Sequence, residues 1–343
     1  MSDTTVGSSV EELPHLRSDA EKITSYYNWG IILLSAAAWF ATAYITETWP
    51  EKGPQGGGWD RTSELVLILS GVGGVALLAA LAGIWSESVY TRIRYAAPWL
   101  IVTAAIILAW ELVTAKFNLL PMPFFPPPQE IIEVVHEDWS RLADSTFASF
   151  KLLAIGYFLG ALMGFLYGVA IGWSKVVAYW SHPVLRFLGP LPATAWLPIA
   201  FFAFPSSWSA ATFLVALATG FPVAVLTWSG VAGVGSAYYD IARTLGANKR
   251  FLILKVAIPA ALPHVFVGLF MGLGASFSVI VVAEMLGVKS GLGWYLQWAQ
   301  GWAAYANMYT ALFVMAISCS WLITVLFRVR DRVLAWQKGL VRW

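Results

Sequence analysis

Residues that could do chemistry are few and widely separated along this chain of 343 residues. The sequence contains neither the G-x-x-x-x-G-K-[ST] phosphate loop of ATPases nor the H-E-x-x-H motif of zinc enzymes. It also lacks the G-x-S-x-G motif of serine hydrolases, and its single cysteine, Cys319, excludes a disulfide framework and a cysteine-based metal site. We therefore expect neither a catalytic centre nor a metal site in this chain.

A carboxylate does stand out, because Glu284 ends a strongly apolar run of the sequence. Ionisable groups in membrane spans are costly and often functional. We interpret Glu284 as a hydrogen-bonded contact to an external loop. The alternative is a transport role, in which Glu284 would couple protons or sodium to a solute. The other candidates for a translocation pathway are Ser276 and Ser278 on the same segment, and Pro192 and Trp196 on an earlier one.

The composition indicates that these residues lie in a membrane. Hydrophobic residues make up 59% of the chain and charged residues 12%, whereas about 25% of an average soluble domain is charged. The 19 tryptophans suit the two membrane–water interfaces. A span needs about 20 mostly apolar residues, and about eight segments meet this condition. They are Tyr27–Thr46, Glu64–Trp85, Ala96–Lys116, Phe147–Trp173, Val177–Phe204, Ala210–Ser229, Val265–Leu286 and Met308–Arg328.

Lysine and arginine gather in alternate loops between these segments, which predicts that those loops face the cytoplasm. Eight spans then place both termini inside, as a tail of residues 1–26 and a tail of residues 333–343. No basic cluster is interleaved with aromatic residues, so nucleic-acid binding has no support. The sequence thus predicts a multi-pass membrane protein with both termini in the cytoplasm. The basic positions are Arg92, Arg94, Lys175, Arg186, Arg243, Lys249, Arg250, Lys255, Arg328, Arg330, Arg332, Lys338 and Arg342.

Three spans have unusual patterns. Two carry small residues every four positions, which predicts close helix packing; these are Gly156, Gly160, Gly164, Gly168 and Gly172 on one span, and Gly268, Gly272 and Ser276 on another. The fifth span carries four prolines within His182–Pro198. Freed backbone groups are tolerated in lipid only inside protein or along a cavity. We expect this segment to be irregular, either as a structural kink or along a pathway.

The loop after the sixth span is the most informative segment. Asp240 can sit in the first turn of a short helix, where its charge meets the helix dipole, and Gly246 would end or bend that helix. A second short helix fits Lys249–Val256, and we expect Pro259 and Pro263 to break it before the next span. Two short helices on the membrane face would form a knob that a partner could push, although an ordinary amphipathic loop remains the alternative.

This loop resembles the EAA loop of ABC-importer permeases, whose pattern is E-A-A-x-x-x-G followed by I-x-L-P. Asp240, Ile241 and Ala242 stand at the E-A-A positions, Gly246 at the glycine, and Ile258-Pro259 near the far end. Asp and Ile are departures from the family's Glu and Ala. The Arg243–Ala247 run is similar to the nitrate/sulfonate/taurine/bicarbonate branch. Three further stretches resemble that branch: Pro190–Pro198, Val281–Met285 with Gly291–Gly293, and Phe125–Ile131.

The resemblance implies an all-α, polytopic transmembrane helix bundle. Residues 89–332 would form a type I ABC importer permease core, and residues 27–88 a two-span accessory module. Such permeases form homodimers, bind two ATPase subunits and receive solute from a periplasmic or lipid-anchored binding protein. This chain would bind no cofactor, because ATP and magnesium bind to the ATPase. The implied ATPase-coupling residues are Asp240, Ala242, Arg243, Leu245, Gly246, Ala247 and Pro259.

The cargo implied by this branch is a small anion such as nitrate, bicarbonate or a sulfonate. Two other classes stay open on the sequence. An ion-coupled secondary transporter would use Glu284, although no inverted repeat is visible. A membrane scaffold subunit would need no pathway at all.

Overall fold

The computed structural model describes residues 14–53, 58–120, 122–189 and 191–337, and every regular element in these ranges is helical. The all-α prediction is therefore confirmed for the described chain. The chain forms two compact units, residues 1–136 and 137–343, which are described separately. Predictions that concern residues 1–13, Pro121, Pro190 and residues 338–343 lie outside the described residues. They include the outer parts of both predicted tails and one proline of the irregular span.

Unit 1 contains three long helices and one short helix. Its elements are α1 (Pro14–Thr48), α2 (Thr62–Trp85), α3 (Glu87–Glu111) with a π-helical turn at Leu112–Lys116, and α4 (Pro128–Glu137). Three segments of unit 1 are long and apolar enough to cross a membrane: Trp29–Thr48, Thr62–Trp85 and Glu87–Lys116. Helix α1 begins at Pro14, before the predicted span at Tyr27, because proline suits a first helical position and good helix formers follow it.

The compact units divide at His136, so the first unit extends past residue 88 and includes α3. The reason is that α3 shares its core with α1 and α2. Ala104 of α3 is buried in a cluster with Trp39 of α1 and Leu65 and Leu69 of α2. Removing α3 from this bundle would expose that cluster, so α3 belongs to the same compact unit as α1 and α2. An accessory module of residues 27–88 stays a prediction.

Unit 1 also holds a buried polar cluster, at the end of α3. The ammonium group of Lys116 donates to the carbonyl oxygen of Thr46 at 2.6 Å, and it lies 3.2 Å from Oε1 of Glu51 and 3.5 Å from Oε1 of Glu111. The amide of Gln129, on α4, donates to Oε1 of Glu111 at 2.7 Å. Buried charges are stable only when paired, so this cluster ties α4 to the first and third spans.

Unit 2 contains the remaining helices. Its elements are α5 (Trp139–Trp173), α6 (Lys175–Leu188), a 3-10 turn (Ala193–Trp196), α7 (Leu197–Ala203), α8 (Ser207–Ala232), α9 (Ser236–Thr244), α10 (Lys249–Phe251), a π-helical segment (Leu252–Ala257), α11 (Ile258–Leu286), α12 (Leu292–Gly301), α13 (Tyr305–Val333) and a 3-10 turn (Ala335–Gln337).

Seven helices among the described residues are long and apolar enough to cross a membrane, or eight if the bent pair of unit 2 counts as one span. That pair is the predicted fifth span. It is irregular, as expected, because α6 and the Ala193–Ala203 segment meet at 88°. Proline removes a backbone donor and clashes with the preceding turn, so a segment with this many prolines does not continue as one straight helix.

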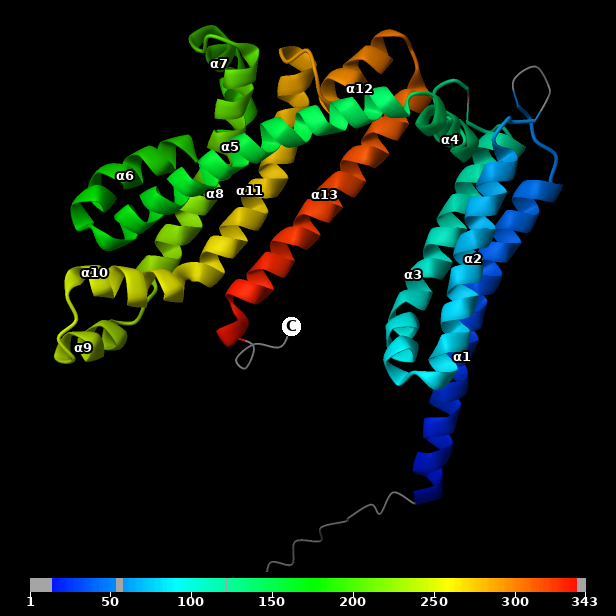
Figure 1. Cartoon of the computed structure of the whole chain (residues 1–343), viewed down its shortest axis with the longest axis horizontal. Coiled ribbons are helices and arrows are strands. Elements are labelled where there is room, and N and C mark those ends of the chain that lie inside the picture. The colour runs from blue at the N-terminus through cyan, green and yellow to red at the C-terminus, as the bar shows by residue number, and fades with distance from the viewer. Residues whose placement is uncertain (1–13, 54–57, 121, 190, 338–343) are drawn as a thin grey trace, which may run out of the picture. The chain divides into compact units, whose positions relative to one another are not determined.

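The predicted small-residue packing is confirmed in unit 2. A side chain at Gly156 of α5 would come within 2.7 Å of Val215 on α8, and one at Gly172 within 2.6 Å of Val231. Gly268 of α11 meets α8 in the same way, with Cα of Val223 at 2.9 Å. Small residues let helix backbones approach closely without a hydrophobic driving force. Helix α8 is thus held between α5 and α11, as Figure 1 shows.

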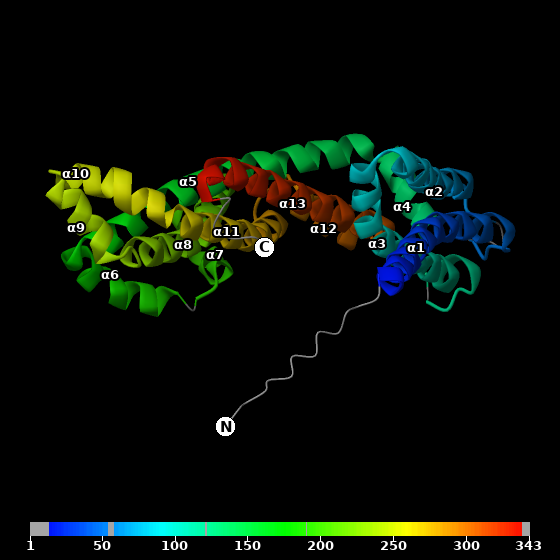
Figure 2. The same ribbon diagram turned by 90° about the horizontal axis from the view of Figure 1, so that it is seen from below.

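The two ends of unit 2 carry different short helices. Helix α12 follows the end of α11, whereas α9 and α10 follow the end of α8. Both views place α9 and α10 at the end of the unit opposite α12 (Figures 1 and 2). The last turn of α13 is basic, with Arg330 and Arg332. Because α9 lies at the end of unit 2 opposite α12, a partner that binds α9 contacts that end of the unit.

Candidate coupling surface and translocation cavity

Residues 236–257 form a compact projection, which we call the coupling knob. It consists of α9, a turn at Gly246, and α10 with the π-helical segment that follows it. Gly246 has a φ of +83°, a conformation that costs glycine little and other residues more. The N–H of Ala247 donates to the carbonyl oxygen of Ala242 at 3.0 Å, which closes the end of α9. The predicted role of Gly246 in ending this helix is confirmed.

Asp240 lies in the middle of α9 and not in its first turn, which contains no acidic residue. The predicted interaction with the helix dipole is therefore wrong. The helix starts at Ser236, about one turn earlier than the sequence pattern suggested, and Gly235 is its N-cap residue. Asp240 instead pairs with Arg243 at 3.0 Å on the exposed side of α9, where both charges are available to a partner.

The second half of the knob begins at Asn248, a residue that the sequence analysis missed. The side chain of Asn248 accepts a hydrogen bond from the N–H of Phe251 at 2.9 Å. Asparagine is a preferred N-cap because it satisfies an otherwise free helix donor. An asparagine directly before Lys249 is a signal that could have located this helix start from the sequence.

The prolines after the knob do not break the chain's helical path, contrary to our expectation. Residues Lys249–Leu286 form one continuous span. Pro259 lies in the first turn of α11 after the π-helical segment, and Pro263 lies inside α11. A π-helical segment changes the backbone hydrogen-bond pattern locally. A proline in the first turn of a helix lacks an N–H group that would have no acceptor within that helix. The knob is thus joined directly to a span.

The knob is also anchored to the spans by side chains. Tyr239 of α9 packs edge-on against Trp173 at the end of α5, with ring centroids 5.9 Å apart. Burial raises the pKa of the Tyr239 phenol, and the nearby Arg243 lowers it by a smaller amount. The buried core beneath the knob joins Val231 of α8 to Ala257 and Ala261. The knob is therefore packed against α5, α8 and α11.

The outer surface of the knob is both apolar and charged. The exposed fractions are 68% for Tyr238, 61% for Ile241 and 82% for Leu245. Asp240, Arg243 and Gly246 are exposed as well, and Ala242, Ala247 and Pro259 are half-buried. The predicted coupling residues thus lie together in and beside one projection. Exposed apolar side chains beside charges are typical of a protein-binding surface.

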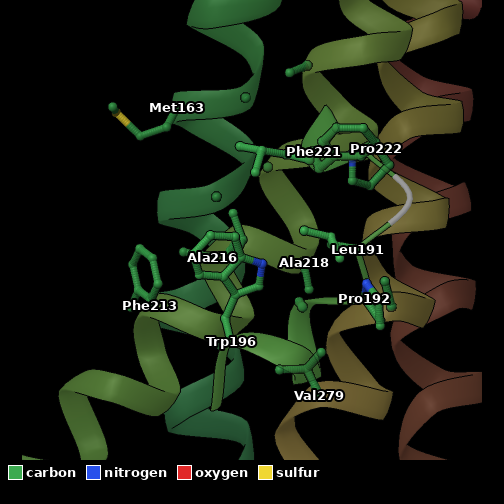
Figure 3. A pocket seen from close by; sticks show the side chains of 18 of the residues that line it. Met163, Leu191, Pro192, Trp196, Phe213, Ala216, Ala218, Phe221, Pro222 and Val279 are labelled. Atoms are coloured by element: carbon green, nitrogen blue, oxygen red, sulfur yellow. The ribbon is translucent and has the colours of Figure 1, made fainter. Parts of the chain in front are cut away.

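A cavity of about 830 Å³ opens in unit 2 between α5, α6, the Ala193–Trp196 turn, α8 and α11. Figure 3 shows the indole of Trp196 among the side chains that line it. The described lining contains no charged side chain. Its polar groups are the hydroxyls of Tyr167, Thr194 and Ser278 and the indole of Trp196. The rest of the lining is aliphatic, aromatic, glycine or proline. It consists of Leu159, Gly160, Met163, Gly164, Val184, Leu185, Leu188, Leu191, Pro192, Ala193, Phe213, Ala216, Leu217, Ala218, Gly220, Phe221, Pro222, Ala224, Ala275 and Val279.

The cavity brings together three of the five pathway candidates from the sequence, namely Pro192, Trp196 and Ser278. Ser276 is fully buried in the contact between α11 and α8, where its hydroxyl lies 2.6 Å from that of Thr219. Glu284 is 2% exposed and is absent from the cavity lining. The structure therefore separates a cavity-lining set from a packing set within the same helix.

Glu284 belongs to a hydrogen-bonded junction between α5, α11 and α12. The hydroxyl of Ser149 on α5 donates to the carboxylate at 2.7 Å, and the N–H of Gly293 donates to it at 2.8 Å. Ser149 in turn accepts from the N–H of Leu292 at 2.8 Å. The structure thus shows the hydrogen-bonded contact that we expected for Glu284. Ser149 was missed, because a serine in an apolar span gives no signal of a partner 135 residues away.

Known proteins match this chain over the same region. Residues 156–335 match the family described as "Binding-protein-dependent transport system inner membrane component". The chain is 30% identical over 239 residues to the nitrate import permease protein NrtB of Leptolyngbya laminosa, an alignment that covers 66% of this chain and 81% of the relative. It is 32% identical over 200 residues to the bicarbonate transport system permease protein CmpB of Synechococcus elongatus, covering 58% of this chain and 68% of the relative.

The matched residues 156–335 include the coupling knob, all of the cavity-lining residues named above and the Glu284 end of the junction. They amount to more than half of the chain, and the nitrate permease adds an alignment over four-fifths of its own length. The helical membrane architecture of the described residues agrees with that assignment. This chain belongs to the inner membrane components of binding-protein-dependent transport systems, and it is a membrane permease.

Proposed function

We propose that this chain is the membrane-spanning permease subunit of an ATP-driven importer of a small anion such as nitrate, bicarbonate or a sulfonate. The observation that supports this most is the coupling knob, an exposed projection that continues without a break into the cavity-lining helix α11. Two relatives carry nitrate and bicarbonate in their names, and their shared chemistry is that of a small oxyanion.

In this proposal each knob docks on a separate ATPase subunit, which binds ATP and magnesium. Tyr238, Ile241 and Leu245 would enter an apolar cleft of the ATPase, and the pair of Asp240 and Arg243 would set its orientation. Movement of the ATPase would reach the cavity through the second half of the knob, because Lys249–Ala257 and the lining residues Ala275, Ser278 and Val279 belong to one span.

The arrangement of the complete importer follows from the same proposal. Two copies of this chain would pair in the bacterial inner membrane, with both termini and the knob on the cytoplasmic side. The basic residues of the knob and of the last turn of α13 support this orientation, because the positive-inside rule favours lysine and arginine in cytoplasmic segments. A periplasmic or lipid-anchored binding protein would deliver the solute on the side of α12.

The cavity would hold the cargo during its passage. The described lining has no charged side chain. The donors that it offers to an anion are hydroxyl groups and the N–H group of an indole. Such donors bind an anion weakly enough to let it leave, as transport requires. The position of Glu284 outside this lining gives no support to ion-coupled transport through that residue.

Reconstitution tests this function directly. The permease would be purified with its ATPase and its binding protein and placed in liposomes with ATP inside or outside. We expect uptake of labelled nitrate, bicarbonate or an alkyl sulfonate that needs ATP and the binding protein. Uptake that is independent of ATP but follows a proton or sodium gradient would overturn the proposal.

A further inference from the structure

Ser149 and Glu284 connect two helices that both line the cavity. Helix α5 contributes lining residues from Leu159 to Tyr167, and α11 contributes lining residues from Ala275 to Val279. Beyond the cavity, toward α12, Ser149 of α5 donates a hydrogen bond to Glu284 of α11. The bond therefore joins the two helices past the cavity, at the end away from the coupling knob.

Helix α12 completes this connection. Its first N–H groups are divided between the two partners, since Leu292 donates to Ser149 and Gly293 donates to Glu284. The carboxylate thus lies at the start of a helix of ten residues, where a negative charge is stabilised. One serine, one glutamate and one helix start satisfy each other's hydrogen bonds in a buried site.

Two glycines of the backbone lie directly against Glu284. A side chain at Gly291, which has a φ of +104°, would overlap the Glu284 carboxyl group. A side chain at Gly293 would lie 2.9 Å from Cβ of Glu284. The segments Val282–Met285 and Gly291–Gly293 therefore enclose the Glu284 carboxyl group tightly. Neither the coupling knob nor the cavity explains this close packing.

Helix α12 has a second anchor, at Tyr295. The hydroxyl of the buried Tyr295 donates to Asp138 at the start of α5 at 2.7 Å and accepts from Asn307 of α13 at 2.7 Å. Burial raises the pKa of the Tyr295 phenol, so this group stays a hydrogen-bond donor. Since α12 is already tied to α5 and α13, loss of the Glu284 contacts would chiefly free the end of α11.

We propose that Ser149 and Glu284 are positioning residues for transport, which hold the ends of α5 and α11 together beyond the cavity. We call this pair the outer latch. It rests on the proposed function in one respect, namely that the cavity is the path of the cargo. In that case, separation of the two helix ends opens the cavity on the side of α12, and the latch determines how tightly that side is closed.

The first test compares substitutions at the two positions in the reconstituted importer. Glu284→Ala should lower uptake about tenfold while ATP hydrolysis continues, because the hydrogen bonds of the buried Glu284 carboxyl group are lost and the helix ends separate. Glu284→Gln keeps an acceptor oxygen for Gly293 and Ser149, so uptake should stay within about threefold of the unchanged protein. Ser149→Ala should fall between them, and Ser320→Ala, on the exposed side of α13, serves as its matched control.

The pattern of these variants separates the latch from ion coupling. A glutamate that carries protons or sodium is inactivated as fully by Gln as by Ala, whereas a positioning residue is rescued by Gln. If Glu284→Ala reduces uptake while ATP hydrolysis continues, the loss of the latch is distinguished from unfolding of the permease, which would abolish both uptake and ATP hydrolysis. Equal loss in Glu284→Gln and Glu284→Ala would overturn the proposal, and so would full uptake in Glu284→Ala.

A second test needs no cargo and therefore holds even if the proposed solute is wrong. Spin labels at Phe147 of α5 and Leu286 of α11, both exposed, would be placed in a Cys319→Ser background and diluted with unlabelled chains. We expect a narrow distance distribution in the unchanged protein and in Glu284→Gln, and a longer or broader one in Glu284→Ala. Identical distributions in all three would contradict the latch. Failure of uptake by the unchanged protein, with this shift present, would count only against the proposed function.

Discussion

The hydroxyl groups of Thr219 on α8 and Ser276 on α11 lie 2.6 Å apart in a fully buried contact. The carbonyl oxygen one turn earlier on the same helix can accept a hydrogen bond from each hydroxyl, at 2.9 Å from Thr219 to Val215 and at 2.7 Å from Ser276 to Gly272. The two helices can approach this closely because the glycine at position 272 faces Thr219. A small polar residue at 276 is therefore part of the helix packing.

We expect Ser276→Ala to lower the free energy of unfolding by about 1 kcal/mol, the usual net value of one hydrogen bond, and to leave uptake unchanged. Ser276→Leu should be far more damaging because no space exists for it. Ser278→Ala, two residues away in the cavity lining, should leave stability unchanged. Thermal unfolding in detergent measures all three. A loss of uptake in Ser276→Ala at unchanged stability would instead place Ser276 on the pathway.

Trp196 offers a test of the cavity. Trp196→Ala removes the largest ring of the lining and its N–H donor, so the apparent KM for the cargo should rise about tenfold with little change in ATPase binding. Phe202→Ala is the matched control, since Phe202 lies on α7 and is 93% exposed. Uptake kinetics in liposomes measure both variants. Equal effects of the two substitutions would argue that the cavity is not the path.

Lys116 tests the polar cluster of unit 1. Lys116→Ala leaves the carboxylates of Glu51 and Glu111 buried without a cation, and breaking such a pair costs about 3–5 kcal/mol. We expect unit 1 to unfold at lower temperature while the permease still binds its ATPase, since the knob lies in unit 2. Lys52→Ala, at an exposed position, should change neither property. Loss of ATPase binding in Lys116→Ala would contradict the expectation that ATPase binding depends on unit 2 alone.

Local patterns in the sequence predicted much of the fold and part of the site. Apolar length located the spans, four-residue glycine spacing located the α5–α8 contact, and Gly246 located the turn of the knob. These features depend on residues that are neighbours in sequence or on one helix face. The division of the units depends instead on α3 packing against α1 and α2, which no local pattern shows.

The prolines illustrate a second limit. Pro259 and Pro263 predict a break, yet the π-helical segment before them and their place in the first turns of α11 let the span continue. The partner of Glu284 was equally hidden, because Ser149 precedes it by 135 residues. Pairings of this kind require the packed helices, and a single sequence does not report which side chains meet.

The most direct test of the account is the affinity of the purified permease for its ATPase when Gly246 is replaced. Gly246→Val forces a β-branched residue into a φ of +83°, which misplaces the two halves of the knob. Gly235→Ala, at a φ of −58° with space for a methyl group, is the control. We predict at least about tenfold weaker binding for Gly246→Val, about 1.4 kcal/mol, with unchanged binding for Gly235→Ala. Equal affinities for both variants and the unchanged protein would contradict the coupling role of the knob.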